Sequence, residues 1–256
     1  MVTISDEGEQ LLRKYLKGAA SKVTTIRNGI PDCDEQKRGN AQGALRIIMV
    51  ARFTKVKEFD VLLRSFATIP RATRLILVGD GPTRPSCESL AHELGISNRV
   101  EFLGSRDEVP SLLAHSDIFV LASKCEMSPI SVLEAMRAGL PIIASDVGGT
   151  REMVGEIGVL VPATSVDPLA KALTDLVENR DLRMRLGQAA RTRFEQYYDF
   201  RRQLASTSSL YKDVLFGGKQ AVHGVSHGVI PDARRHTRTS APAVLDITTA
   251  EEDVAA

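Results

Sequence analysis

The sequence contains little cysteine, no excess of charge of either sign and no long apolar run. Its three cysteines are an odd number without CxxC spacing, which argues against a disulfide framework and against a zinc site. The 33 basic residues balance 32 acidic ones, so a formal net charge of +1 gives no field that would attract a polyanion. We therefore expect reduced thiols and no nucleic acid as the main partner.

The lack of long apolar runs also bears on membranes and secretion. No run approaches the roughly 18 residues that a membrane span needs. The first residues, MVTISDEGEQ, have neither the basic start nor the apolar stretch of a signal peptide. We therefore expect a cytoplasmic chain with at most a peripheral association at the inner face of the membrane. At 43% hydrophobic and 25% charged residues, it has the composition of an ordinary globular protein.

From residue 44 onward, short apolar runs alternate with helical patterns. The runs are ALRIIMVA, TRLILVG, RVEFLG, DIFVLAS, PIIASD and GVLVP. Near-continuous apolar strands that alternate with helices are typical of a parallel sheet buried on both faces. The fold class predicted for residues 41–215 is therefore α/β, with a doubly wound parallel sheet, and its ligand site is expected at the carboxyl ends of the strands.

The two ends of the chain differ from this middle part. Residues 1–40 offer a helix that Ser5 could cap, a VTTI strand and a turn at Arg27–Gly29, too little to bury a core. Residues 216–256 are rich in Gly, His, Arg, Thr and Ser and have no lasting periodicity. We predict a disordered tail there.

A glycine-rich turn, Gly79-Asp80-Gly81-Pro82, follows the second apolar run. A dinucleotide fingerprint needs a third glycine, but Arg84 occupies that position. The phosphate-loop pattern GxxxxGK[ST] is absent from the sequence. A nicotinamide site is thus only weakly indicated, and the glycines could serve backbone geometry alone.

Two cations follow the first apolar run, Arg52 at its end and Lys57 five residues later. A planar guanidinium and a point-charge ammonium at the carboxyl end of a strand could together hold a diphosphate. The same spacing also fits solvated loop charges, so the sequence leaves both interpretations open.

The stretch EMSPISVLEAM, residues 126–136, places two glutamates around a predicted helix start. Glu126 lies just past a strand, Ser128 suits the N-cap and Pro129 the first helical position. The following helix carries only Glu134 and Arg137 as charges, so we expect it to be mostly buried and its carboxylate to need partners such as hydroxyls. The helix start also offers free backbone donors to a phosphate. The alternative is a capped helix with a chance glutamate.

A second polar loop, Ser145 to Glu152, contains Gly148 and Gly149 at the end of another strand. It fits either a tight turn or a loop that lines a substrate. His92 and His115 lie among polar residues of predicted helices, where surface histidines are the ordinary case. No Ser-His-Asp or metal-ligand cluster is indicated by the spacing.

Taken in order, these stretches resemble the C-terminal, nucleotide-sugar-binding domain of the family 4 glycosyltransferases. The resemblance covers about residues 44–200, and its most specific part is E-x7-E followed by A-G-x-P in DIFVLASKCEMSPISVLEAMRAGLPIIASD. It implies a retaining enzyme of GT-B fold, in which two Rossmann-like domains face each other. The chain would supply the second of these domains, and residues 1–40 a remnant of the first with its linker.

The resemblance also implies roles for single residues. Arg52 and Lys57 would hold the donor diphosphate, and Glu126 would contact the hydroxyls of the transferred sugar. The backbone from Met127 through Ser128 to Ile130 would lie along sugar and phosphate, Glu134 would bind the ribose, and Phe102 and Leu103 would border the base. No metal or cofactor is implied, since the nucleotide-sugar is a substrate.

Three positions depart from the family pattern, which usually has glycine at Ala51, Glu58 and Met127. The added side chains are expected to narrow the donor pocket, and Glu58 to bring a negative charge near the phosphate clamp. Under this resemblance, we expect the acceptor domain to be missing apart from the remnant at residues 1–40. The expected function is transfer of a hexosyl group from a nucleotide-sugar to a glycan, lipid-linked or small-molecule acceptor. The alternatives are a non-catalytic nucleotide-sugar-binding subunit or truncated pseudoenzyme that needs a separate acceptor-domain chain, and a sugar-nucleotide epimerase.

Overall fold

The computed structural model describes residues 1–16, 18, 22–33, 43–70 and 72–216. Apart from Phe216, the predicted disordered tail at 216–256 lies outside the described residues, and Phe216 itself ends a helix.

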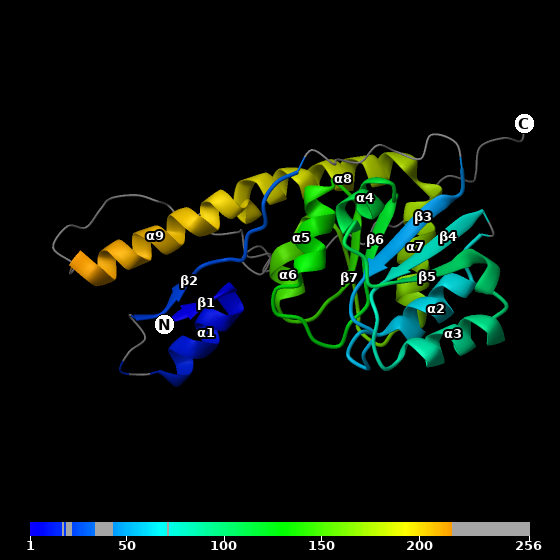
Figure 1. The fold of residues 1–256 in the computed structure, drawn as a ribbon, viewed down its shortest axis with the longest axis horizontal. Coiled ribbons are helices and arrows are strands. Elements are labelled where there is room, and N and C mark those ends of the chain that lie inside the picture. The colour runs from blue at the N-terminus through cyan, green and yellow to red at the C-terminus, as the bar shows by residue number, and fades with distance from the viewer. Residues whose placement is uncertain (17, 19–21, 34–42, 71, 217–256) are drawn as a thin grey trace, which may run out of the picture. The chain divides into compact units, whose positions relative to one another are not determined.

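A parallel sheet of six strands forms the centre of the part of the chain that the structure describes (Figure 1). The strands are β3 (Leu45–Val50), β4 (Thr73–Val78), β5 (Val100–Gly104), β6 (Ile118–Leu121), β7 (Ile142–Ser145) and β8 (Val159–Val161). Their order across the sheet is β5-β4-β3-β6-β7-β8, and each neighbouring pair is parallel. The predicted fold class is confirmed.

Helices cover both faces of the sheet, which explains why its strands are mostly apolar. They are α2 (Phe59–Ala67), α3 (Arg84–Glu93), α4 (Val109–Ala114), α5 (Ile130–Arg137), α6 (Gly149–Val154), α7 (Val166–Glu178) and α8 (Arg180–Arg193). Helix α2 packs against α3 and α7, whereas α5 packs against α4 and α8. All four residues of β6 and of β7 are buried, as expected for strands that never face water.

The strand order reverses beside β3. From β3 the chain proceeds outward through β4 to β5, and then returns to the other side of β3 to form β6, β7 and β8. Such a reversal leaves a crevice at the carboxyl ends of β3 and β6, because the loops after these strands turn to opposite faces. The ligand site expected at the carboxyl ends of the strands would therefore lie between the β3–α2 loop and the β6–α5 loop.

Among its described residues, the N-terminal segment forms a small unit of one helix and two strands outside the six-stranded sheet. It contains β1 (Val2–Thr3), α1 (Asp6–Tyr15) and β2 (Thr24–Thr25), with β1 and β2 paired in parallel. Ser5 caps α1 as predicted, because its hydroxyl accepts a hydrogen bond of 3.1 Å from the backbone N–H of Gly8. No residue of α1 is buried.

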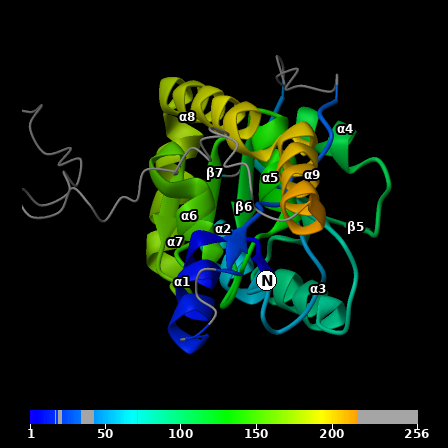
Figure 2. The ribbon, with the colours of Figure 1, turned by 90° about the vertical axis from the view of Figure 1, so that its left-hand side faces the viewer.

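The chain after α8 turns through one π-helical segment, Phe194–Tyr198, into α9 (Phe200–Phe216). The helical path breaks at Asp199, which is extended and whose carboxylate accepts from Arg201. Two 3-10 turns, Ser97–Arg99 and Gly155–Ile157, complete the elements. Helix α9 continues from this break and has no buried residue (Figures 1 and 2).

Candidate functional site

Hydrogen bonds join the two loops at the strand-order reversal. The backbone N–H of Glu58 donates to the carbonyl of Ala122 at 3.1 Å, and that of Lys124 donates to the carbonyl of Val56 at 2.9 Å. The Ser123 hydroxyl donates to the same Val56 carbonyl at 3.2 Å. The β3–α2 and β6–α5 loops are therefore held in a fixed register against each other.

This register brings Lys57 and Glu126 together. The Lys57 ammonium donates to Oε1 of Glu126, in an ion pair whose side chains are only 21% and 8% exposed. A carboxylate with so little exposure needs a charged or hydrogen-bonding partner, because burying it alone costs several kcal/mol. The sequence predicted these residues as separate ligands of phosphate and sugar; the structure shows that each is a partner of the other.

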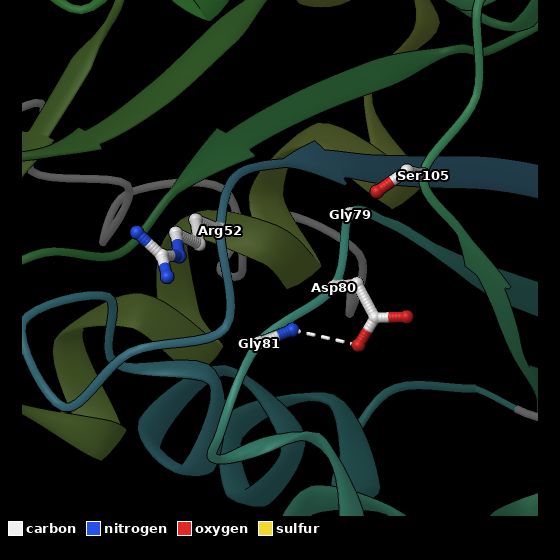
Figure 3. Close-up of a pocket in the computed structure, with 5 residues that line it drawn as sticks. All are labelled: Arg52, Gly79, Asp80, Gly81 and Ser105. Carbon is white, nitrogen blue, oxygen red and sulfur yellow. Dashed lines mark hydrogen bonds between the residues drawn. The ribbon is translucent and has the colours of Figure 1, made fainter.

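Arg52 lies at a second feature, a surface pocket of about 610 Å³ (Figure 3). It is lined by Arg52, Gly79, Asp80, Gly81 and Ser105, from the loops that follow β3, β4 and β5. The Arg52 side chain is exposed, and within the described ranges its guanidinium has no ion pair or hydrogen bond. Figure 3 shows it extending away from the Asp80 carboxylate, which accepts a 2.7 Å hydrogen bond from the N–H of Gly81. Arg52 is thus available to an anion.

The glycines of this pocket are required by close backbone contacts. A Cβ at Gly79 would lie 2.1 Å from the carbonyl oxygen of Ala51, and one at Gly81 would lie 2.3 Å from that of Phe53. Both glycines have positive φ, 126° and 153°. The geometry therefore supports the interpretation that these glycines serve the backbone conformation of the turn.

Helix α5 begins one residue later than predicted. Ser128 was expected at the N-cap, but the cap is Pro129, with an extended ψ of 118°, and the helix starts at Ile130. The prediction was wrong because the Ser128 hydroxyl is engaged elsewhere: it accepts from the side-chain amide of Asn28 at 3.3 Å. No side chain caps the helix, and among the described residues no acceptor is found for the backbone N–H groups of Ile130 and Ser131.

Glu134 lies half-buried in the second turn of α5. Burial raises the pKa of its carboxyl, and the nearby Arg137 opposes this only in part. Among the described residues no hydrogen bond to this carboxylate is found, so it retains acceptor capacity. The rest of the helix is mostly buried, as predicted; its buried residues are Val132, Leu133, Ala135, Met136 and Arg137.

The loop after β7 supports the loop that carries Glu126. The N–H of Gly149 donates to the carbonyl of Glu126 at 2.9 Å, and a Cβ at Gly149 would lie 1.6 Å from the carbonyl oxygen of Met127. Of the two interpretations left open for this loop, the geometry favours a turn that fixes the backbone beneath the site. Asn28, whose side-chain amide donates to Ser128 in the same loop, is a residue beside the candidate site that the sequence did not single out.

Glu58 and Met127 differ in where their side chains lie. Glu58 is 2% exposed, and its carboxylate accepts from the N–H and the hydroxyl of Thr164 at 3.0 and 2.7 Å. It therefore stabilises the β8–α7 turn, where Thr164 has a φ of 60°, rather than projecting as a loop charge. Met127 is 59% exposed beside Glu126, so its side chain stands at the mouth of the crevice.

Phe102 and Leu103 are half-buried in β5, directly before Gly104 and the pocket residue Ser105. The Phe102 ring lies 6.1 Å from that of Phe53. Arg84, at the missing third-glycine position, donates to the Phe102 carbonyl at 3.3 Å. These contacts place the predicted base-bordering segment next to the pocket.

Within the described ranges, no group of three or more His, Cys, Asp or Glu side chains could hold a metal ion. None of the described helices is both long and apolar enough to cross a membrane.

Comparison with known proteins decides the family. Residues 32–193 match the pattern of the family described as "Glycosyl transferases group 1". The chain belongs to this family. An N-acetyl-alpha-D-glucosaminyl L-malate synthase of Bacillus anthracis is 31% identical over 185 residues, which are 71% of this chain and 49% of that protein. A GDP-mannose-dependent alpha-(1-6)-phosphatidylinositol monomannoside mannosyltransferase of Mycobacterium tuberculosis is 31% identical over 57% of this chain and 41% of that protein.

Solved structures of glycosyltransferases share the fold of this group 1 member. HepE of Anabaena, solved in complex with UDP, superposes with a TM-score of 0.74 at 23% identity, over 82% of this chain and 63% of that one. Sucrose-phosphate synthase of Thermosynechococcus elongatus gives a TM-score of 0.74 at 26% identity, over 83% of this chain and 57% of that one. The family expected from the resemblance is confirmed, and the chain spans about half the length of the curated relatives described above.

Proposed function

We propose that this chain is the nucleotide-sugar-binding half of a retaining glycosyltransferase that transfers a hexosyl group to a glycan, lipid-linked or small-molecule acceptor. The observation that carries the proposal is the arrangement at the strand-order reversal. Arg52 and Lys57 lie in the loop after β3, and Glu126 and the start of α5, which no side chain caps, lie in the loop after β6, at the carboxyl ends of neighbouring strands. Open α/β sheets bind their ligands at this place.

The chemistry of these groups fits a nucleoside diphosphate leaving group. Arg52 and Lys57 would bind the diphosphate together with the backbone from Met127 through Ser128 to Ile130. As the bond to the sugar breaks, negative charge builds on the diphosphate, and fixed positive groups stabilise that charge in the transition state. These groups can do so without a metal ion.

The two glutamates would accept hydrogen bonds from hydroxyl groups of the nucleotide-sugar. Glu126 would accept from hydroxyls of the transferred sugar, and Glu134 from those of the ribose. The raised pKa of Glu134 supports this assignment, because a half-buried carboxylate gains most from donors that a ligand brings. Phe102 and Leu103 would border the base beside the 610 Å³ pocket.

A second candidate function is a nucleotide-sugar-binding subunit that transfers only when a separate acceptor-domain chain completes the site. Its support is the exposed apolar surface of α9, on which a partner chain could pack. The large apolar side chains exposed there are Phe200, Leu204, Tyr211, Val214, Leu215 and Phe216.

The experiment has two stages. Calorimetric titration of the 256-residue chain with UDP, GDP and ADP is expected to show that at least one binds; binding of none would refute the donor site. A transfer assay with the matching nucleotide-sugar, with and without a candidate acceptor-domain protein, then separates the two functions. Transfer by the chain alone supports the enzyme, and transfer only in the mixture supports the subunit.

A further inference from the structure

The ion pair between Lys57 and Glu126 links the residue proposed to bind phosphate to the residue proposed to bind sugar. Under the proposed function, Lys57 binds phosphate and Glu126 binds sugar, yet the structure pairs their charges with each other. A ligand that engages Lys57 therefore changes what surrounds Glu126.

The pair cannot relax easily, because the backbone on both sides is fixed. The Glu126 carbonyl accepts from Gly149, and the Val56 carbonyl, next to Lys57, accepts from Lys124. Within the described ranges, neither side chain has another ion pair. Glu126 is 8% exposed, so water replaces a lost partner poorly.

We propose that Glu126, acting through Lys57, makes the site discriminate a nucleotide-sugar from the nucleoside diphosphate that lacks the sugar. This inference rests on the proposed function. A diphosphate draws the ammonium of Lys57 toward its own oxygens and weakens the pair, which leaves the buried Glu126 carboxylate undersatisfied. A nucleotide-sugar compensates, because its sugar hydroxyls donate to that carboxylate. The diphosphate alone brings no such donors and binds at the cost of the pair.

The same coupling favours product release. After transfer the sugar leaves with the acceptor, and the Glu126 carboxylate loses its hydroxyl donors. Lys57 then regains Glu126 as its partner at the expense of the diphosphate. The diphosphate thus binds more weakly than the nucleotide-sugar and dissociates faster for the same reason, namely that Lys57 pairs with Glu126 again.

The test compares affinities of the full chain and of Glu126→Gln for two ligand classes. The probes are UDP, GDP and ADP, and UDP-glucose, GDP-mannose and ADP-glucose. Glutamine keeps the shape but not the charge, so Lys57 is released to the phosphate. We expect the diphosphate to bind roughly tenfold tighter and the nucleotide-sugar to bind more weakly than in the parent. Glu93→Gln, which removes an exposed carboxylate at the end of α3, is the charge-matched control and should change neither.

A double-mutant cycle shows whether Lys57 mediates the effect. In the Lys57→Gln background, Glu126→Gln should no longer tighten diphosphate binding. If it tightens binding equally in both backgrounds, or weakens it in the parent, the inference is wrong. If Glu126→Gln does not fold, Glu126→Ala serves the same cycle. Absence of binding of all three diphosphates and of all three nucleotide-sugars to the parent chain would instead refute the proposed function itself, so the two failures are distinguishable.

Discussion

The loops at the carboxyl edge of the sheet and the N-terminal segment are held to the same domain by different forces. The loops are joined by backbone hydrogen bonds and by glycine contacts that leave no room for a methyl group. The N-terminal helix α1 has no buried residue, and polar contacts carry much of its attachment. Arg27 pairs with Asp6 and with Glu152 of α6, and the N–H of Asp6 donates to Glu152 at 2.8 Å.

This difference teaches which part of the molecule is preorganised. Loops fixed by backbone contacts keep their geometry when a ligand binds, and that rigidity is what a site for charged groups requires. A segment held by a few ion pairs and by only two buried apolar side chains among its described residues, Val23 and Ile26, opens at lower free energy than the core. Substitutions in the loops should therefore affect ligand binding most, whereas substitutions in the N-terminal segment should affect only the stability of that segment.

The largest effect is expected from Gly149→Ala. The added methyl would lie 1.6 Å from the Met127 carbonyl oxygen, so the loop carrying Glu126 must move. We expect a destabilisation of about 3 kcal/mol from overpacking and loss of nucleotide binding. Denaturant unfolding and calorimetric titration measure the two. Gly18→Ala is the control, because a methyl group at that position would have no other atom within 4 Å. Unchanged nucleotide binding in Gly149→Ala would mean that the loop is not rigidly supported.

The next largest effect is expected from Arg52→Ala, which tests a single charge of the rigid region. Loss of a charge-assisted contact should weaken nucleoside diphosphate binding by about 1.5 to 3 kcal/mol and leave folding unchanged. Titration with UDP, GDP and ADP checks this. Lys55→Ala removes an exposed cation from the same loop and is the matched control. Equal losses in both variants would indicate a diffuse field instead of a direct contact.

A smaller, local effect is expected from Arg27→Gln in the N-terminal segment. Burial and the neighbouring Asp6 already raise the pKa of Glu152, and Arg27 counteracts them. Without Arg27, the two carboxylates repel each other, and we expect a loss of about 1 kcal/mol. Hydrogen exchange should increase in residues 1–16 but not in β3 to β8. Lys171→Gln, which breaks the exposed pair with Asp175, should leave both unchanged. Exchange that increases across the sheet would show that the segment is part of the core.

The sequence predicted the sheet well, because alternating apolar runs and helices leave a parallel sheet as the natural way to bury both faces. It did not predict the pairing inside the site. Lys57 and Glu126 are 69 residues apart, and their contact depends on β3 and β6 being neighbours, which alternation alone does not specify. The prediction of Ser128 as the N-cap was wrong for a similar reason, since its hydrogen-bond partner Asn28 is 100 residues away in the sequence.

The smallest effect is expected from Glu134→Gln, which separates the demands of binding from those of stability. The pKa of Glu134 is raised above its ordinary value because burial disfavours the charged carboxylate. Its contribution to the free energy of unfolding is therefore most favourable below the unfolded pKa and declines as pH rises through the folded one. At about pH 4 the variant and the parent should have similar stability, whereas at about pH 7 the variant should be slightly more stable and bind the nucleotide more weakly. Urea unfolding at the two pH values measures the first difference, with Glu93→Gln as the control. If the variant is less stable at neutral pH, then Glu134 is satisfied by the protein itself and is not held ready for a ligand.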